Sequence, residues 1–279
     1  MCKHTILHVK IEPHRTDDIG CTNPTAMPSH KQLTIEIHTI KEHDTSPKGR
    51  VQGSPQSGEH DNTFSIIIYI KNIIDDTLHN QTLQHLSSIP PDDWRAGFVG
   101  NHQIRRLQRW HHHDDKVFCD KWANTYDRWN PIAYDDWLLH LEQTLQDAVQ
   151  KYVGDIITKF KGNPLHFNSV LVNKYSDGTH FIHAHRDSER IFGDNPTIVS
   201  ISFGATRKFI LQRVHYDPDN PTKLARNKDE SHKDIEFDLE SGSIVIMAGA
   251  SQKYYSHQVT RDETSHTPRY NLTFREHKC

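Results

Sequence analysis

Pairs of histidine and aspartate separated by one residue are the first feature of this 279-residue chain that could do chemistry. Such a pair, joined by a second histidine from elsewhere, can occupy one face of an octahedral metal ion and leave the other positions open. The chain contains 23 histidines, so the pattern alone does not select a site. The His-x-Asp pairs end at Asp114, Asp115, Asp187, Asp217 and Asp234.

Local context favours the pair formed by His185 and Asp187. It follows a short segment, FIHAH, in a part of the chain rich in predicted strands. Two of the other pairs lie in the run HHHDD at 111–115, for which a solvated loop is the favoured interpretation. The third ligand is expected on a later strand. His257, which follows the apolar segment SIVIMAG, is the main candidate, and His266 is its competitor.

The segment RYNLTFR at 269–275 strengthens this interpretation. Alternation along a strand would put Arg269, Asn271, Thr273 and Arg275 on one face. Two guanidinium groups that face a barrel interior are costly without anions, whereas on an edge strand they would lie in water. The first case predicts that both arginines bind a dicarboxylate such as 2-oxoglutarate through charge-assisted hydrogen bonds.

The elements that must position these residues change character along the chain. Residues 1–63 contain no Phe, Tyr or Trp, so we expect a disordered tail in which only Lys31 to Ile40 could form a strand. Folded structure is expected from residue 64, with a helix that stops before Pro90 and a second helix over 135–152. Beyond Asn163, short β-rich segments alternate with turns.

This pattern predicts a mainly β fold with flanking helices, an α+β arrangement around a double-stranded β-helix (jelly-roll) core. The folded domain is expected to span 64–279, with the jelly roll over 161–279 and the supporting helices in 64–160.

Composition excludes several classes of protein. The formal net charge of -3 argues against nonspecific coating of nucleic acid. The four cysteines form no CxxC pair, which argues against a disulfide framework. No apolar run approaches the length of roughly 20 residues that spans a bilayer. We therefore predict an intracellular monomer, in the nucleus or cytoplasm, without a membrane partner.

In their order along the chain, these motifs resemble the AlkB-type Fe(II)- and 2-oxoglutarate-dependent dioxygenases, particularly the branch that repairs alkylated DNA. The resemblance runs from about residue 64 to residue 278. The matching motifs are NKY at 173–175, HRDSE at 185–189, PTIVSISFG at 196–204, His257 and RYNLTFR at 269–275.

The resemblance implies an enzyme that uses Fe(II), 2-oxoglutarate and O2 to demethylate bases such as 1-methyladenine and 3-methylcytosine in DNA, with release of formaldehyde. It makes His185, Asp187 and His257 the iron ligands and the catalytic centre. It also implies five residues that bind 2-oxoglutarate: Asn173, Tyr175, Arg269, Asn271 and Arg275.

The resemblance assigns substrate recognition to residues 64–160, where two motifs depart from the family pattern. His111 stands where the family has Tyr, and Asn124 stands where it has an aromatic residue. The implied substrate-binding residues are Trp110, Tyr126, Glu189, Arg106 and Arg109. Candidates for contacts with the phosphate backbone are Arg105, Arg106, Arg109, Arg207, Lys208, Arg213, Lys223, Arg226, Lys228 and Lys233.

Three other functions remain open at this point. The chain could demethylate RNA rather than DNA, and only contacts to a 2′-hydroxyl would separate the two. It could also hydroxylate a protein, as other members of the wider oxygenase class do. A non-enzymatic, His-rich, cupin-like module would bind metal without turning over 2-oxoglutarate, and it would leave Arg269 and Arg275 unexplained.

Overall fold

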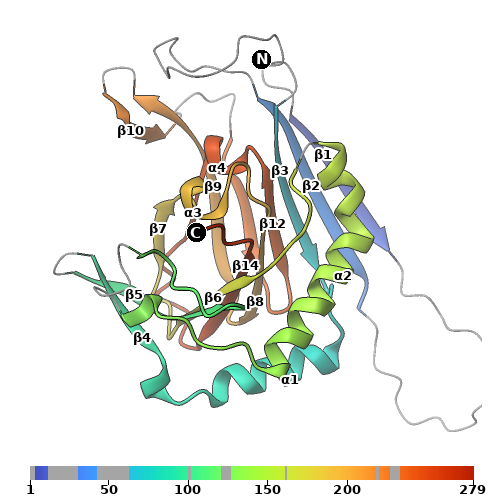
Figure 1. The fold of residues 1–279 in the computed structure, drawn as a ribbon. Helices are drawn as coiled ribbons and strands as arrows, with labels where there is room; N and C mark the ends of the chain where they lie inside the picture. The colour runs from blue at the N-terminus through green and yellow to red at the C-terminus, as the bar shows by residue number, and fades with distance from the viewer. Residues whose placement is uncertain are drawn as a thin grey trace, which may run out of the picture.

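The structure is a computed structural model that describes residues 4–11, 31–42, 63–99, 102–120, 127–160, 162–217, 220–226 and 233–279. Within these residues, two β-sheets pack face to face and helices cover the outer face of the larger sheet (Figure 1). This arrangement agrees with a jelly-roll core and flanking helices. No helix in the described part of the chain is long and apolar enough to cross a membrane.

The large sheet joins the N-terminal part of the chain to the predicted jelly roll, and its strands pair antiparallel. In spatial order its described strands are β1 (His4–Ile11), β2 (Leu33–Glu42), β3 (Thr63–Lys71), β12 (Ile244–Gly249), β8 (Ile198–Gly204), β14 (Arg269–Arg275), β6 (Ser169–Tyr175), β5 (His102–His112) and β4 (Arg95–Val99).

The small sheet carries two of the candidate metal ligands. In spatial order its strands are β10 (Asn220–Arg226), β9 (Arg207–Asp217), β13 (Tyr255–Val259) and β7 (Ile182–His185). A further strand, β11 (Ile235–Leu239), also pairs with β9.

The central strands of the large sheet are buried on both faces, which explains the run of isoleucines in β3. Ile66, Ile68 and Ile70 pack in the core on the helix side, whereas Ile67 and Tyr69 belong to the core between the sheets. Successive side chains of a strand point to opposite faces, so a continuously apolar strand can serve two cores. The sheet is therefore the central layer of the molecule.

Two long helices, α1 (Asp76–Ser88) and α2 (Asp136–Lys159), cover the outer face of this sheet (Figure 1). The carboxylate of Asp75 accepts the backbone N–H of Leu78 at 2.7 Å, and Asp135 caps α2 in the same way. Both predicted helices are confirmed, although α2 is longer than expected. Shorter helical turns are η1 (Pro91–Asp93), η3 (Asp127–Trp129), α3 (Glu189–Phe192) and α4 (Ser251–Tyr254).

The prediction of a tail with one strand is confirmed in part. The strand expected within Lys31 to Ile40 is present as β2, which pairs with β3 from Thr34 to Glu42. The expectation of disorder is wrong for residues 4–11, which form β1 and pair with β2. Leucine and isoleucine supply the buried surface of β2, so the absence of aromatic residues did not prevent core formation. Residues 1–3, 12–30 and 43–62 of the predicted tail lie outside the described residues.

The interpretation of the HHHDD run as a solvated loop is wrong for His111 and His112, whereas residues 113–115 are exposed and follow the end of β5. His111 and His112 are buried at the end of β5, and His113 Nε2 lies 3.0 Å from the carboxylate of Glu142 on α2. His111 Nδ1 lies 3.1 Å from the carbonyl oxygen of Ala133, to which the neutral ring donates. Burial lowers the pKa of His111 to about 4.

A buried ion pair joins the two sheets at the end of β2. Arg213 Nη2 on β9 lies 2.6 Å from Glu42 Oε2, and both side chains are almost fully enclosed. The predicted contact between Arg213 and a phosphate backbone is therefore wrong, because the guanidinium group is already paired inside the protein.

We expect Arg213→Met to lower the free energy of unfolding by about 3 to 5 kcal/mol, because it leaves the Glu42 carboxylate buried without a counter-ion. Urea denaturation measures this loss. The double variant Glu42→Gln/Arg213→Met should recover most of it, since no unpaired charge remains. The matched control is Lys208→Met, because Lys208 lies on β9 as Arg213 does. It breaks an exposed ion pair with Glu236 and should lower the free energy of unfolding by less than about 1 kcal/mol. Equal losses in Arg213→Met and Lys208→Met would contradict the prediction.

The lowered pKa of His111 predicts destabilisation in mild acid. In the unfolded chain this histidine has a pKa of 6.5, whereas in the folded chain its pKa is about 4. Between these two values the unfolded chain binds a proton and the folded chain does not. Stability from this group is therefore complete above pH 6.5 and falls by about 2 kcal/mol on going to pH 5. His111→Asn, which can still donate to Ala133, should reduce this pH dependence in urea denaturation. A variant of the exposed His140 should retain it, and an unchanged slope in His111→Asn would refute the assignment.

Candidate active site

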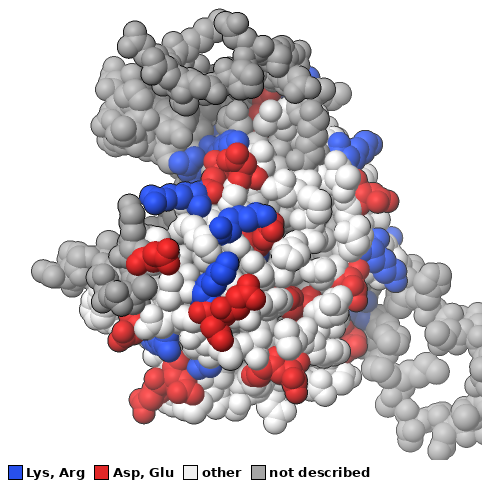
Figure 2. Space-filling view, in the orientation of Figure 1, with Lys and Arg blue, Asp and Glu red and all other residues white. Residues whose placement is uncertain are grey.

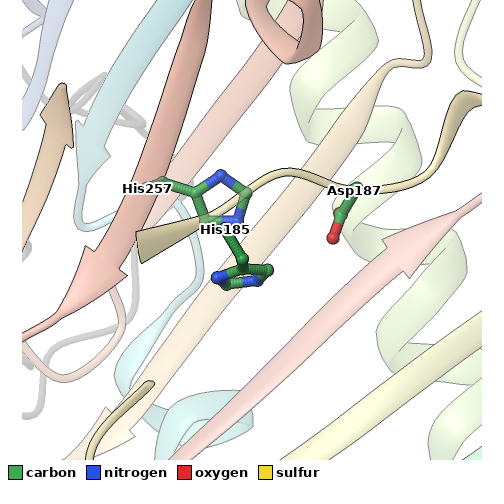
Figure 3. Close-up of side chains that lie close together, drawn as sticks. All are labelled: His185, Asp187 and His257. Carbon is green, nitrogen blue, oxygen red and sulfur yellow. The ribbon is translucent and has the colours of Figure 1, made fainter. Parts of the chain in front are cut away.

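A cavity of about 260 Å³ lies between the two sheets, and the candidate metal ligands line it. His185 ends β7, Asp187 lies in the turn that follows, and His257 lies on β13. β7 and β13 pair antiparallel with His185 opposite His257, so both imidazoles project to the same side of the small sheet. Figure 3 shows the three side chains around a common point.

The geometry of these three residues fits a metal ion. One ligand atom from each of His185, Asp187 and His257 lies within 4.8 Å of the others. The Nδ1 atom of His257 is buried and has no hydrogen-bond partner among the described residues. Two imidazoles and one carboxylate form the facial donor set typical of non-haem Fe(II) sites, which leaves coordination positions open for other ligands.

The electrostatics of the site keep all three groups in the protonation state that a metal requires. Burial, with a contribution from His185, lowers the pKa of His257 to about 3, so the ring is neutral at neutral pH. Burial also lowers the pKa of His185, although Asp187 opposes this shift. Burial would raise the pKa of Asp187, but Arg275 holds it below its usual range.

Arg269 and Arg275 line the same cavity as the metal ligands. Arg269 is 1% exposed, and its Nη2 donates to Ser202 Oγ at 2.9 Å, but its Nε and Nη1 have no partner among the described residues. Arg275 Nε donates to Asp187 Oδ2 at 2.8 Å, and its Nη1 has no partner there. Buried N–H groups of this kind require an acceptor, and a dicarboxylate would supply one for each arginine.

The other residues expected to bind 2-oxoglutarate also line the cavity. The Asn173 side-chain oxygen accepts hydrogen bonds from Arg106 Nε and Gln108 Nε2, each at 3.0 Å, which leaves the amide nitrogen to donate elsewhere. Tyr175 is buried beneath the guanidinium of Arg269, at 5.0 Å from ring centroid to Cζ.

Asn271 is positioned differently from this expectation. Its amide nitrogen donates to Ser200 Oγ and to the carbonyl of Ile201, and its oxygen accepts from Thr273. Both ends of the Asn271 amide are therefore engaged within the protein.

The residues expected to bind substrate are not brought together. Arg106 lines the cavity, whereas Arg109, on the other face of β5, donates to the backbone oxygen of Asp93. Trp110 is fully buried and donates to the carbonyl of Lys116, so the structure places it in the core rather than on the cavity wall. Glu189 accepts the backbone N–H of Asn195 and is not among the cavity-lining residues. Tyr126 lies outside the described residues.

Arg207 is a further correction to the predicted phosphate contacts. Its side chain is 1% exposed and donates to the backbone oxygen of His180 at 2.8 Å, and also to that of Thr260. It therefore braces the segments next to β7 and β13. On the face shown in Figure 2, described Lys and Arg residues are interspersed with Asp and Glu, in keeping with the net charge of -3.

Sequence reasoning missed Phe118, which forms an aromatic wall of the cavity. Trp129, for which the sequence left a substrate role and core packing equally open, lines the cavity beside it, and the two rings stack with centroids 4.0 Å apart and an interplanar angle of 19°. Phe118 lies in the segment KVFCD, which carries no recognisable motif. The number of aromatic residues in this region was the only available signal.

Comparisons with known proteins agree with this site. The family model of the 2OG-Fe(II) oxygenase superfamily matches residues 67–275. DNA oxidative demethylase ALKBH2 from Arabidopsis thaliana is 33% identical over 117 residues, which cover 39% of this chain and 37% of that protein. Alpha-ketoglutarate-dependent dioxygenase alkB homolog 3 from Mus musculus is 36% identical over 109 residues, which cover 39% of this chain and 36% of that protein.

The chain thus spans a little over one third of the length of these curated relatives. A solved structure of OsALKBH1 aligns with a TM-score of 0.48 and 17% identity, over 75% of this chain and 97% of that one. The matched region holds His185, Asp187, His257 and both buried arginines. Because the family model matches well over half of the chain, the protein belongs to the 2OG-Fe(II) oxygenase superfamily, and the curated relatives that it resembles are AlkB homologues.

Proposed function

We propose that this protein is an Fe(II)- and 2-oxoglutarate-dependent dioxygenase that demethylates alkylated bases in DNA, such as 1-methyladenine and 3-methylcytosine, with release of formaldehyde. One observation carries this proposal: a His-Asp-His metal set lines the same cavity as two buried arginines, each with N–H groups that have no partner among the described residues. The name of the ALKBH2 relatives, DNA oxidative demethylase, supports DNA as the substrate.

His185, Asp187 and His257 would hold the iron. When bound, the iron together with 2-oxoglutarate and O2 supplies the oxidation of a methyl C–H bond. The neutral imidazoles and the ionised carboxylate need not lose protons to bind it. Arg275 orients the Asp187 carboxylate through one oxygen, which leaves the second oxygen for the metal.

Arg269 would bind a carboxylate of the cosubstrate in the cavity. Its Nε and Nη1 groups, which have no partner among the described residues, lie on different edges of the guanidinium and can each donate to a carboxylate oxygen. The phenol ring of Tyr175 supports the guanidinium from one side, and Ser202 holds it from another. The cosubstrate is thereby oriented before the methylated base enters.

A methylated base must leave its stack to reach a cavity between two sheets. Phe118 and Trp129 present aromatic surface at the cavity wall, and stacking of this kind tolerates different bases. Hydroxylation of an N-methyl carbon gives a hemiaminal that expels formaldehyde and restores the ring nitrogen. This outcome requires neither a nuclease nor a glycosylase.

We expect Arg269→Met to raise the 2-oxoglutarate concentration needed for half-maximal turnover by at least about 30-fold, because a buried charge pair is lost. The same variant should not lower the unfolding temperature of the protein without cosubstrate, since it removes a buried charge whose N–H groups are unsatisfied. Succinate production and thermal unfolding measure these effects. The control Arg261→Met alters an exposed arginine after β13 and should behave as wild type. A wild-type cosubstrate requirement in Arg269→Met would contradict the pocket assignment.

The reaction itself is tested by anaerobic loading with Fe(II) and 2-oxoglutarate, followed by oxygen. Succinate and loss of methyl groups are scored in parallel on DNA and RNA oligonucleotides that contain 1-methyladenine. We expect demethylation of DNA that Asp187→Ala abolishes. Demethylation of RNA in preference to DNA would overturn the substrate class, and succinate without demethylation would overturn the nucleobase assignment. Neither product from iron-loaded, folded protein would favour a binding module.

A further inference from the structure

The backbone of Asp187 is held by a side chain from another part of the chain. Asp187 lies in the turn between β7 and α3, where no sheet hydrogen bonds fix the backbone. Its N–H donates to the side-chain oxygen of Gln252 at 2.9 Å. Gln252 lies on α4 and is 2% exposed.

The preceding residue is tied to the same short helix. Arg186 Nη1 donates to the backbone oxygens of Gln252 at 3.3 Å and of Lys253 at 3.1 Å. Two successive residues of the ligand-bearing turn are thus attached to α4. β13, which follows α4 directly, carries His257. The helix therefore links the segment that supplies Asp187 to the segment that supplies His257.

Asp187 is consequently fixed at two points. Arg275 holds the carboxylate at 2.8 Å, and Gln252 holds the backbone N–H. Because an aspartate side chain is short, a shift or rotation of its backbone displaces the carboxylate by a similar amount. The hydrogen bond from Arg275 constrains the Asp187 carboxylate but not the Asp187 backbone. Gln252 supplies the constraint on the backbone.

We infer that Gln252 is a positioning residue that sets the metal affinity of the site through the backbone of Asp187. The inference rests on metal binding by His185, Asp187 and His257, which is part of the proposed function. Partners that orient metal ligands typically change metal affinity by 10- to 100-fold when they are removed. We expect an effect of about that size.

The side chain offers a clean substitution. Among the described residues, the Gln252 amide nitrogen contacts only the sulfur of Met247, at 3.5 Å, whereas its oxygen accepts the hydrogen bond from the Asp187 N–H. Gln252→Met has nearly the same shape and removes the acceptor. Gln252→Glu keeps an oxygen at the same distance along the side chain and should restore the bond.

The test uses Co(II) as the probe, titrated into metal-free protein and followed by its visible absorption, which also reports ligand geometry. We expect Gln252→Met to bind Co(II) about 10- to 100-fold more weakly than wild type, and Gln252→Glu to recover most of the difference. Hydrogen exchange of the 186–190 segment in the metal-free protein should become faster in Gln252→Met. This readout requires neither metal nor turnover.

Gln258→Met is the matched control. Gln258 lies beside His257 on β13, is half-buried, and hydrogen-bonds Gln212 rather than a ligand segment. It should leave Co(II) affinity unchanged. Wild-type Co(II) affinity in Gln252→Met, unchanged exchange in segment 186–190, or an equal loss in Gln258→Met would each overturn the inference.

Failure of the metal site itself is recognised separately. Asp187→Ala should abolish Co(II) binding. If it binds Co(II) as wild type does, the metal centre and the proposed function both fail. If it loses binding while Gln252→Met does not, the proposed function stands and only the role of Gln252 is refuted.

Discussion

The guanidinium groups of Arg269 and Arg275 lie in an enclosed space between two sheets, next to a carboxylate and two imidazoles. Burying a cation without enough acceptors costs several kcal/mol, so the surrounding protein must supply the free energy that holds them there. The salt bridge between Arg275 and Asp187 offsets part of that cost, whereas among the described residues Arg269 donates to the hydroxyl of Ser202 and lies beside the ring of Tyr175. The unsatisfied N–H groups are the structural basis for anion recognition.

Apolar packing on both faces of the central strands of the large sheet stabilises the fold and so offsets the free energy of burying these cations. In β14, Arg269, Thr273 and Arg275 face the cavity, while Tyr270 and Phe274 pack in the helix-side core. β14 also pairs with β6 on one side and β8 on the other, so the register of these strands fixes the positions of the side chains that face the cavity. Rigid strands hold functional groups more accurately than loops do.

The metal ligands depend on a different set of constraints. His185 and His257 are cross-strand neighbours in the small sheet, and their spacing follows from that pairing. Asp187 lies outside the strands, so its position depends on the hydrogen bond that its carboxylate accepts from Arg275 and on the one that its backbone N–H donates to Gln252. Arg207, which binds the backbone oxygens of His180 and Thr260, braces the segments that flank these two strands. Strand register therefore sets the positions of His185 and His257, whereas hydrogen bonds with the side chains of Arg275 and Gln252 set the position of Asp187.

Local periodicity in the sequence was enough to predict the strand alternation of RYNLTFR and the β-rich class. The metal ligands His185, Asp187 and His257 were implied by the resemblance of ordered motifs to a known family, because the residues alone left His257 and His266 as alternatives. The sequence also predicted α2, although not its full length. Tertiary structure decided what depends on distant partners: that β2 belongs to the core, that Arg207 and Arg213 point inward, that Trp110 packs in the core, and that Gln252 reaches Asp187. Burial and long-range contacts depend on how the two sheets pack against each other. The type of a residue does not show which distant residue it will contact, and this is especially true of polar and charged residues.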